Sequence, residues 1–90
     1  MQFVIHFSIA PEQRDAAQAR FTATGAPPPK GVTMTGRWHC AHGREGFLVC
    51  ETTDAAALAT WIQQWSDLLT LRVLPVVDDQ TMAQVISSVK

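Results

Sequence analysis

The clearest pattern near the start of the chain is an alternation of side chains over residues 2–9. One side of this segment carries the apolar residues Phe3, Ile5, Phe7 and Ile9, and the other carries Val4, His6 and Ser8. A repeat of two residues is typical of a β-strand, because successive side chains point to opposite faces. The pattern therefore predicts a strand over residues 2–9.

A helix is expected next, from Pro11 to about Thr24. Proline suits the first turn of a helix, where its missing N–H has no partner to lose. Ala17 and Phe21 lie one turn apart and form the expected buried side. Gly25 is a natural stop, because glycine readily adopts the left-handed conformation that follows many helices.

Two further strands are expected to form a hairpin. Residues 26–31, with the sequence APPPKG, cannot continue a helix and are expected to be a stiff connection. Residues 32–40 then alternate, with Arg37 and His39 on the face opposite to that of Trp38. After a turn at residues 42–45, residues 46–52 are largely apolar on both faces, so their orientation in the sheet stays open.

The remaining pattern predicts a helix, a strand and another helix. Asp54 is the expected cap of the first helix, whose apolar stripe is Leu58, Trp61, Ile62 and Trp65. The strand spans residues 68–77, and Asp78 or Asp79 caps a last helix. The apolar stripe of that helix is Met82, Val85, Ile86 and Val89.

The order of these elements predicts the fold class. A βαββαβ order is typical of the ferredoxin-like α+β fold, here with an extra C-terminal helix and a four-stranded antiparallel sheet of order 4-1-3-2. The last strand is then an edge strand, which agrees with Pro75 inside it, because proline is tolerated at sheet edges. Ninety residues fit a single domain over positions 1–90.

Composition points to self-association and excludes some partners. Apolar residues make up 47% of the chain and charged residues only 17%, against the usual quarter or so. A small domain with so few charges is expected to bury surface against a second copy, so we predict a homodimer. The net charge is −1 without a basic run, so no nucleic-acid partner is expected.

No segment has the length of an apolar membrane helix, and the first residues lack the features of a signal peptide. We therefore expect no membrane partner and a cytoplasmic location, where Cys40 and Cys50 stay reduced.

Candidate site residues gather on the sheet face that is expected to point away from the helices. These are His6, Arg37, His39 and Arg72. Histidine titrates near neutrality and arginine offers a planar fork for carboxylate or phosphate, so this set can orient a small anionic ligand. Alternatively, these side chains pair with Glu51, Asp67 or backbone groups across a dimer interface, and we favour this second interpretation.

Trp38 stands beside Arg37 and His39, and it either lines a pocket for an aromatic ligand or belongs to the core. No metal site is expected, because neighbouring strand residues such as His39 and Cys40 point to opposite faces. No cofactor is expected either, since the chain has no Gly-rich phosphate loop, nucleophile elbow or HExxH motif.

Four segments resemble a family of short bacterial proteins that is known only as a domain of unknown function. They are Gly25 to Pro29 with Gly31, Gly36 to His39, Trp65 to Leu68, and Pro75 to Asp79. The resemblance implies the dimeric α+β barrel fold, in which two ferredoxin-like subunits pair sheet to sheet. It implies no activity, although the wider superfamily includes small monooxygenases and haem proteins, and fold does not determine function.

We therefore expect a non-enzymatic dimeric module that binds a small molecule or a protein partner. The alternative is a small cofactor-independent enzyme of the monooxygenase type. Its pocket is lined by His6, Trp38 and His39, with His6 or His39 as the catalytic base.

Overall fold

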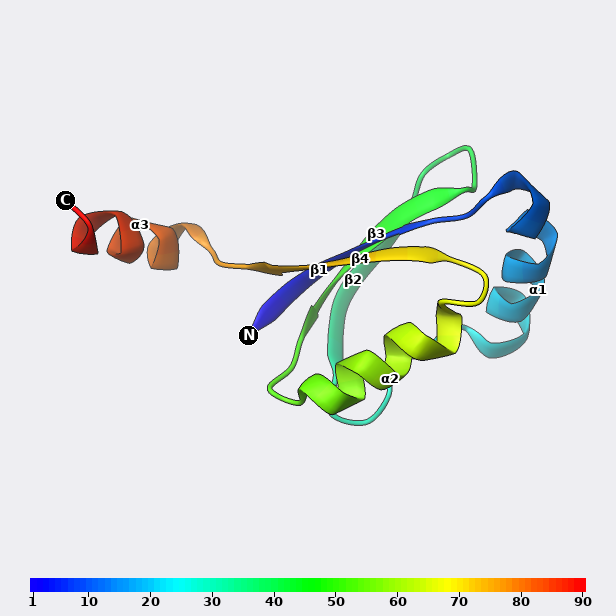
Figure 1. Cartoon of the computed structure of the whole chain (residues 1–90), viewed down its shortest axis with the longest axis horizontal. Coiled ribbons are helices and arrows are strands. Elements are labelled where there is room, and N and C mark those ends of the chain that lie inside the picture. The colour runs from blue at the N-terminus through cyan, green and yellow to red at the C-terminus, as the bar shows by residue number, and fades with distance from the viewer.

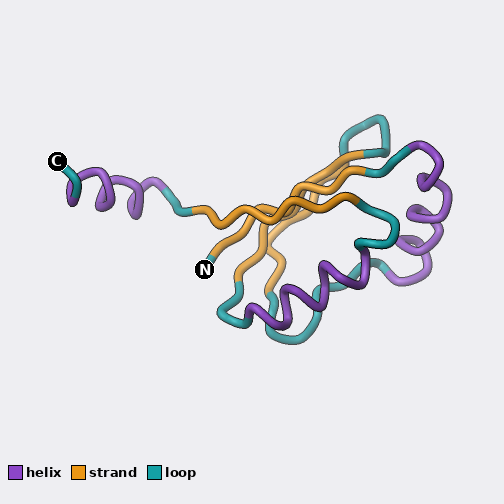
Figure 2. Tube along the Cα trace, viewed as in Figure 1, coloured by secondary structure: helices purple, strands orange, loops and turns teal.

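The computed structural model describes residues 1–90 and contains one antiparallel sheet with two helices on the same side of it (Figures 1 and 2). The strands are β1 (Gln2–Ser8), β2 (Thr33–His39), β3 (Glu45–Glu51) and β4 (Thr70–Val76). The helices are α1 (Arg14–Thr24), α2 (Ala55–Trp65) and α3 (Asp79–Ser88). The strand order is β2-β3-β1-β4, which confirms the predicted 4-1-3-2 arrangement and places Pro75 on an edge strand.

The predicted helix boundaries are confirmed by their caps. Gly25 has a φ of 74° and its N–H donates to the Phe21 carbonyl at 2.7 Å, which ends α1. The Asp54 carboxylate accepts from the backbone N–H of residue 57, and Asp78 caps α3 in the same way. One difference is found at Pro11, which begins a short 3₁₀ turn (Pro11–Gln13) before the α-helix proper.

The inner face of the sheet, which we define as the face toward α1 and α2, carries the core. Ile5 of β1 lies opposite Leu48 of β3 and Val73 of β4. The buried cluster on this face consists of Ile5, Val32, Leu48, Cys50, Leu58 and Trp61. Leu48 and Cys50 therefore point toward the helices, and Phe47 and Val49 point the other way, which resolves the orientation that the sequence left open.

A β-bulge at Thr35 overturns the predicted orientation of β2. Met34 pairs with Cys50 and Gly36 pairs with Val49, so Thr35 has no partner of its own in β3. An extra residue shifts the alternation by one position. Consequently Arg37 and His39 lie on the inner face, and Trp38 lies on the outer face, the reverse of what strict alternation predicts.

Helix α3 lies apart from the rest of the structure (Figure 1). None of its residues is buried. The radius of gyration is 15.0 Å, whereas a compact domain of this length has about 12 Å. The predicted stripe of Met82, Val85, Ile86 and Val89 is thus present on a helix, but it packs against nothing within the chain.

Gly46 in β3 is required by the packing of the inner face. A Cβ at this position overlaps both the Phe7 ring and the backbone carbonyl oxygen of Trp38. The carbonyl belongs to the paired strand β2 and cannot move freely. We expect Gly46→Ala to lower the free energy of unfolding by about 1–3 kcal/mol, the usual cost of overpacking a core. Urea denaturation followed by circular dichroism measures this change.

Gly36→Ala is the matched control for this prediction. The three heavy atoms nearest to a Cβ there all belong to the ring of Trp38, which is 54% exposed in the single chain and can rotate away. Its cost should therefore be clearly smaller than that of Gly46→Ala. Equal losses in the two variants would contradict the assigned packing.

Candidate functional site

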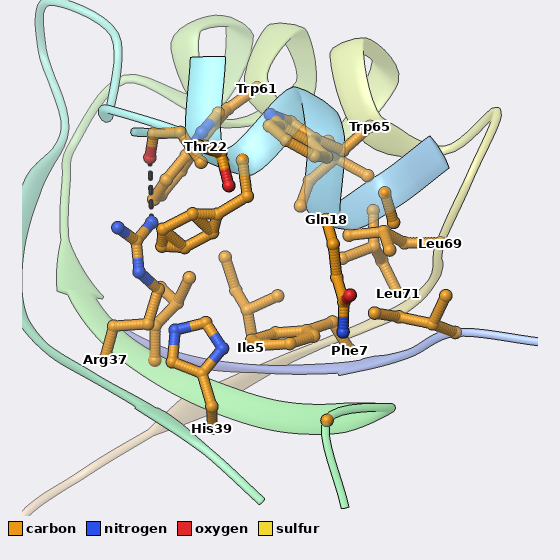
Figure 3. A pocket seen from close by; sticks show the side chains of 17 residues that line it. Ile5, Phe7, Gln18, Thr22, Arg37, His39, Trp61, Trp65, Leu69 and Leu71 are labelled. Atoms are coloured by element: carbon orange, nitrogen blue, oxygen red, sulfur yellow. Dashed lines mark hydrogen bonds between the residues drawn. The ribbon is translucent and has the colours of Figure 1, made fainter. Parts of the chain in front are cut away.

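A cavity of about 480 Å³ lies between the inner face of the sheet and helices α1 and α2 (Figure 3). We call it the inner pocket. Its lining is mainly apolar, and its larger apolar side chains are Ile5, Phe7, Ile9, Phe21, Leu48, Trp61, Ile62, Trp65, Leu69 and Leu71. Its polar side chains are Gln18, Thr22, Arg37 and His39. No acidic residue is among the lining residues, so arginine and histidine supply all of its ionisable groups.

The inner sides of α1 and α2 carry both small and large side chains, and these shape the pocket. Ala17 is only 3% exposed and allows α1 to approach the sheet, while Phe21, one turn later, stands at the wall. On α2, Trp61 is 4% exposed and belongs to both the core and the pocket wall. The half-buried Trp65, one turn further along, lines the same cavity.

Arg37 anchors one side of the inner pocket. Its Nη1 donates to the Ala26 carbonyl at 2.8 Å and its Nη2 donates to the Gly25 carbonyl at 2.9 Å. The guanidinium carbon also lies 4.8 Å from the centre of the Phe21 ring. Burial lowers the pKa of the Arg37 side chain, yet an arginine stays charged. This cation has backbone carbonyls as partners and no carboxylate.

His39 stands between two aromatic rings at the pocket. Its ring centroid is 5.7 Å from that of Phe7 and 5.1 Å from that of Phe21. Figure 3 shows the imidazole directed toward the cavity from β2, beside Arg37. The bulge at Thr35 thus places two neighbouring polar groups at the edge of an apolar cavity.

The structure divides the predicted site between the two faces of the sheet. His6, Trp38 and Arg72 lie on the outer face, in one cross-strand row with Phe47. Trp38 is 54% exposed and its ring centroid is 6.1 Å from that of Phe47. The structure therefore does not bring His6, Trp38 and His39 together at the inner pocket, because His39 alone of the three lines it.

The outer-face histidine has a carboxylate partner. His6 Nε2 lies 3.1 Å from Glu45 Oε1, and His42 Nε2 lies 3.3 Å from Glu45 Oε2. Arg37 binds backbone groups of its own chain instead. Within one chain these side chains form no ion pair with Glu51 or Asp67, and Asp67 pairs with Arg20. Pairing across a dimer interface stays a prediction.

Sequence reasoning missed several residues of the inner pocket, notably Gln18, Phe21 and Thr22 as candidate ligand contacts. Their spacing held a usable signal, because Gln18 and Thr22 are exposed polar residues that each follow a residue of the inner side of α1, Ala17 and Phe21. A helix side that mixes a small residue, an aromatic ring and two polar groups is unusual for a closed core.

The cysteines do not approach one another. Cys50 lies in the core opposite Met34, and its burial raises the pKa of the thiol. Cys40 follows the other end of β2. The structure contains no group of three His, Cys, Asp or Glu side chains that is able to hold a metal ion. Its helices are too short or too polar to cross a membrane.

An ion pair holds α1 against the end of α2 beside the inner pocket. Arg20 donates to both carboxylate oxygens of Asp67, at 2.8 and 2.7 Å, and to the Gln64 carbonyl at 3.0 Å. Its guanidinium also lies 5.3 Å from the centre of the Trp65 ring. The hydrogen bonds from Arg20 hold the pKa of Asp67 below its ordinary value.

Asp67→Asn is expected to lower the melting temperature slightly at neutral pH, and this difference should disappear in acid. Because the pKa of Asp67 is lowered in the folded state, the ion pair stabilises the fold fully at pH values above the unfolded-state pKa of about 3.9. This stabilisation is lost as the pH falls through the lower pKa of the folded state. Differential scanning fluorimetry from neutral pH down to about pH 2.5 checks this. Asp15→Asn, which removes an exposed carboxylate paired only with its neighbour Arg14, is the control. A difference that persists in acid would contradict the assignment.

Comparisons with known proteins agree with this fold. No curated protein matches the chain. Among solved structures, it is similar to Rv0793 from Mycobacterium tuberculosis, with a TM-score of 0.50 and 20% sequence identity. The alignment covers 87% of this chain and 95% of that one, and at this identity it shows the fold alone. A family model matches residues 1–90 in full, and the chain therefore belongs to the family described as a domain of unknown function, DUF3303.

Proposed function

We propose that this protein is a non-enzymatic module that binds a small planar molecule in the inner pocket. The ligand is largely apolar and carries one carboxylate or similar anionic group. The observation that carries the proposal is the lining of the pocket, which combines aromatic walls with Arg37 and His39 and has no acidic side chain.

The size and chemistry of the inner pocket suit such a ligand. Its volume of about 480 Å³ lies within the range of small-molecule sites. Phe21 and Trp65 offer flat apolar surface, and an aromatic ring packed against them gains both burial and favourable ring geometry. Arg37 uses one N–H of each terminal nitrogen for backbone carbonyls, so its other N–H groups are free to donate to a carboxylate.

A pair of probes that differ only in charge tests the proposal. We expect 2-naphthoate to bind saturably and to change the intrinsic tryptophan fluorescence, because Trp61 and Trp65 line the pocket. The neutral 2-naphthamide should bind more weakly. Arg37→Gln should reduce the affinity for naphthoate by about 10- to 100-fold, the effect of losing a charge-assisted hydrogen bond, and change the affinity for the amide much less.

Arg72→Gln is the matched control for Arg37→Gln, because Arg72 lies on the outer face, away from the inner pocket. Isothermal titration calorimetry with both variants separates a pocket contact from a general effect of protein charge. Equal losses in the two variants, or no saturable binding of either probe, would overturn the proposal.

The proposal includes a homodimer that forms through the outer face of the sheet. The centre of that face is a row of apolar or small residues, Gly36, Val49, Val4 and Leu74. The next row carries the exposed rings of Trp38 and Phe47 together with His6 and Arg72. Polar residues such as Thr70 and Glu51 lie at the ends of the face, and an apolar centre with a polar rim is the usual anatomy of an interface. This pairing is the one that the resemblance to dimeric α+β barrels implies. The proposal also keeps the bacterial origin that the resemblance implies and the cytoplasmic location expected from the sequence.

The alternative function, a small cofactor-independent monooxygenase-type enzyme, is supported by His39 alone. Its ring stands at an apolar cavity where an imidazole can accept a proton from a bound phenol or a similar acid. Turnover of an aromatic substrate that is lost in His39→Gln, with naphthoate binding retained, would favour the enzyme over the binding module.

A further inference from the structure

The polar side chains of the inner pocket differ in whether they have partners within the chain. Of the four, only Arg37 is hydrogen-bonded, to the backbone carbonyls of Gly25 and Ala26. Gln18 is exposed at the edge of the pocket, so water solvates its amide while no ligand is bound. A ligand that fills the pocket displaces this water, and the amide then needs a partner on the ligand.

Gln18 and Arg37 lie at opposite ends of the inner pocket. Arg37 binds the carbonyls of Gly25 and Ala26, just after α1 ends. Gln18 is seven residues before Gly25 on the same helix, a rise of about 10 Å. Its Nε2 atom lies beside the turn between β2 and β3, 3.4 Å from the position that a Cβ on Gly43 would occupy. Figure 3 shows the amide directed into the cavity, on the side away from Arg37.

Aromatic rings line the pocket between these two ends. The centre of the Phe21 ring lies 4.8 Å from the guanidinium carbon of Arg37. Phe7 of β1 lies beside the start of β3, close to the turn between β2 and β3. The His39 ring stands between them, 5.1 Å from Phe21 and 5.7 Å from Phe7. A flat ring system that spans the pocket therefore meets a cation at one end and the neutral carboxamide of Gln18 at the other.

We propose that the ligand of the inner pocket carries a second, uncharged polar group at the end opposite its carboxylate, and that Gln18 binds this group and determines the specificity of the site. The inference rests on the proposed function and narrows its ligand to a hydroxy- or oxo-substituted aromatic carboxylate. A carboxamide both donates and accepts hydrogen bonds, so it suits a hydroxyl or a carbonyl group. A ligand that is apolar at this end covers the amide without pairing it, which lowers the affinity.

Isothermal titration calorimetry with two isomeric probes tests the role of Gln18. The hydroxyl of 6-hydroxy-2-naphthoate lies at the far end of the ring system from the carboxylate, whereas that of 3-hydroxy-2-naphthoate lies next to it. The 6-hydroxy probe should bind about fivefold to tenfold more tightly than 2-naphthoate, the effect of one neutral hydrogen bond, and the 3-hydroxy probe should not. Gln18→Met has a similar length but no amide, so it should remove the gain and leave the affinity for 2-naphthoate nearly unchanged.

Gln84→Met is the matched control, because Gln84 lies on α3, apart from the inner pocket, and this variant should keep the gain. Three results overturn the inference and leave the proposed function standing, provided that 2-naphthoate itself binds in an Arg37-dependent manner. These are equal affinity of the wild-type protein for 2-naphthoate and the 6-hydroxy probe, an equal gain with the 3-hydroxy isomer, and a gain that survives in Gln18→Met. No saturable binding of any of these naphthoates overturns both.

Discussion

Trp61→Ala is expected to lower the free energy of unfolding by about 3–5 kcal/mol, the usual cost of removing a buried aromatic side chain. Trp61 is 4% exposed and packs within the cluster that contains Ile5, Leu48 and Leu58. A chain of this length has a total stability of roughly 5–13 kcal/mol, so the variant should be close to unfolding at physiological temperature. Urea denaturation followed by far-ultraviolet circular dichroism measures the loss.

Trp65→Ala is the size-matched control, because Trp65 is only half-buried and stands beside the open side of the inner pocket. Its loss should be distinctly smaller than that of Trp61→Ala. If Trp61→Ala costs less than about 1 kcal/mol, the core is not organised around α2 as described. The difference between the two losses measures how much more Trp61 contributes to the packing of α2 on the sheet than Trp65, which stands beside the pocket.

Phe47→Asp is expected to convert the proposed dimer into a monomer, with a dissociation constant raised by at least about a thousandfold. Each copy loses a buried aromatic ring and places a carboxylate in the proposed interface instead, beside His6 and Arg72, and burying such a charge costs several kcal/mol. Sedimentation velocity over a range of protein concentrations measures the shift. Thr33→Asp, which adds the same charge near the end of the outer face, should weaken the dimer much less.

The inner pocket should remain intact in the Phe47→Asp monomer. The pocket lies on the inner face of the sheet, whereas Phe47 points to the opposite side. Naphthoate should therefore bind to the variant with nearly wild-type affinity. A monomer that loses both the dimer and the ligand would show that the pocket depends on the partner, contrary to the proposed function.

Several parts of the fold follow from local sequence alone. The alternation over residues 2–9 predicts β1 correctly, because a strand with one buried face must place its apolar side chains at every second position. Gly25, Asp54 and Asp78 mark real helix ends, since capping depends on a few neighbouring backbone groups. Pro75 identifies the edge strand because the missing N–H is harmless only there.

Local sequence predicts the candidate site less well than it predicts the helices and strands. Arg37, His39 and Arg72 share one face of the predicted sheet, yet the structure separates the first two from the third. One unpaired residue, Thr35, is sufficient for this, because each strand residue faces opposite to the one before it. A bulge depends on how β2 pairs with β3, and the sequence of β2 alone does not reveal that pairing.

The sequence by itself thus determined the elements, their order and the edge position of β4, all of which depend on short-range periodicity and capping. The tertiary structure decided which face Arg37 and His39 occupy, that a cavity opens beside them, and that α3 lies uncovered. These features arise from contacts between segments far apart in the chain. An apolar stripe such as that of α3 shows that a surface needs a partner, and only the packed structure shows that the partner is absent from its own chain.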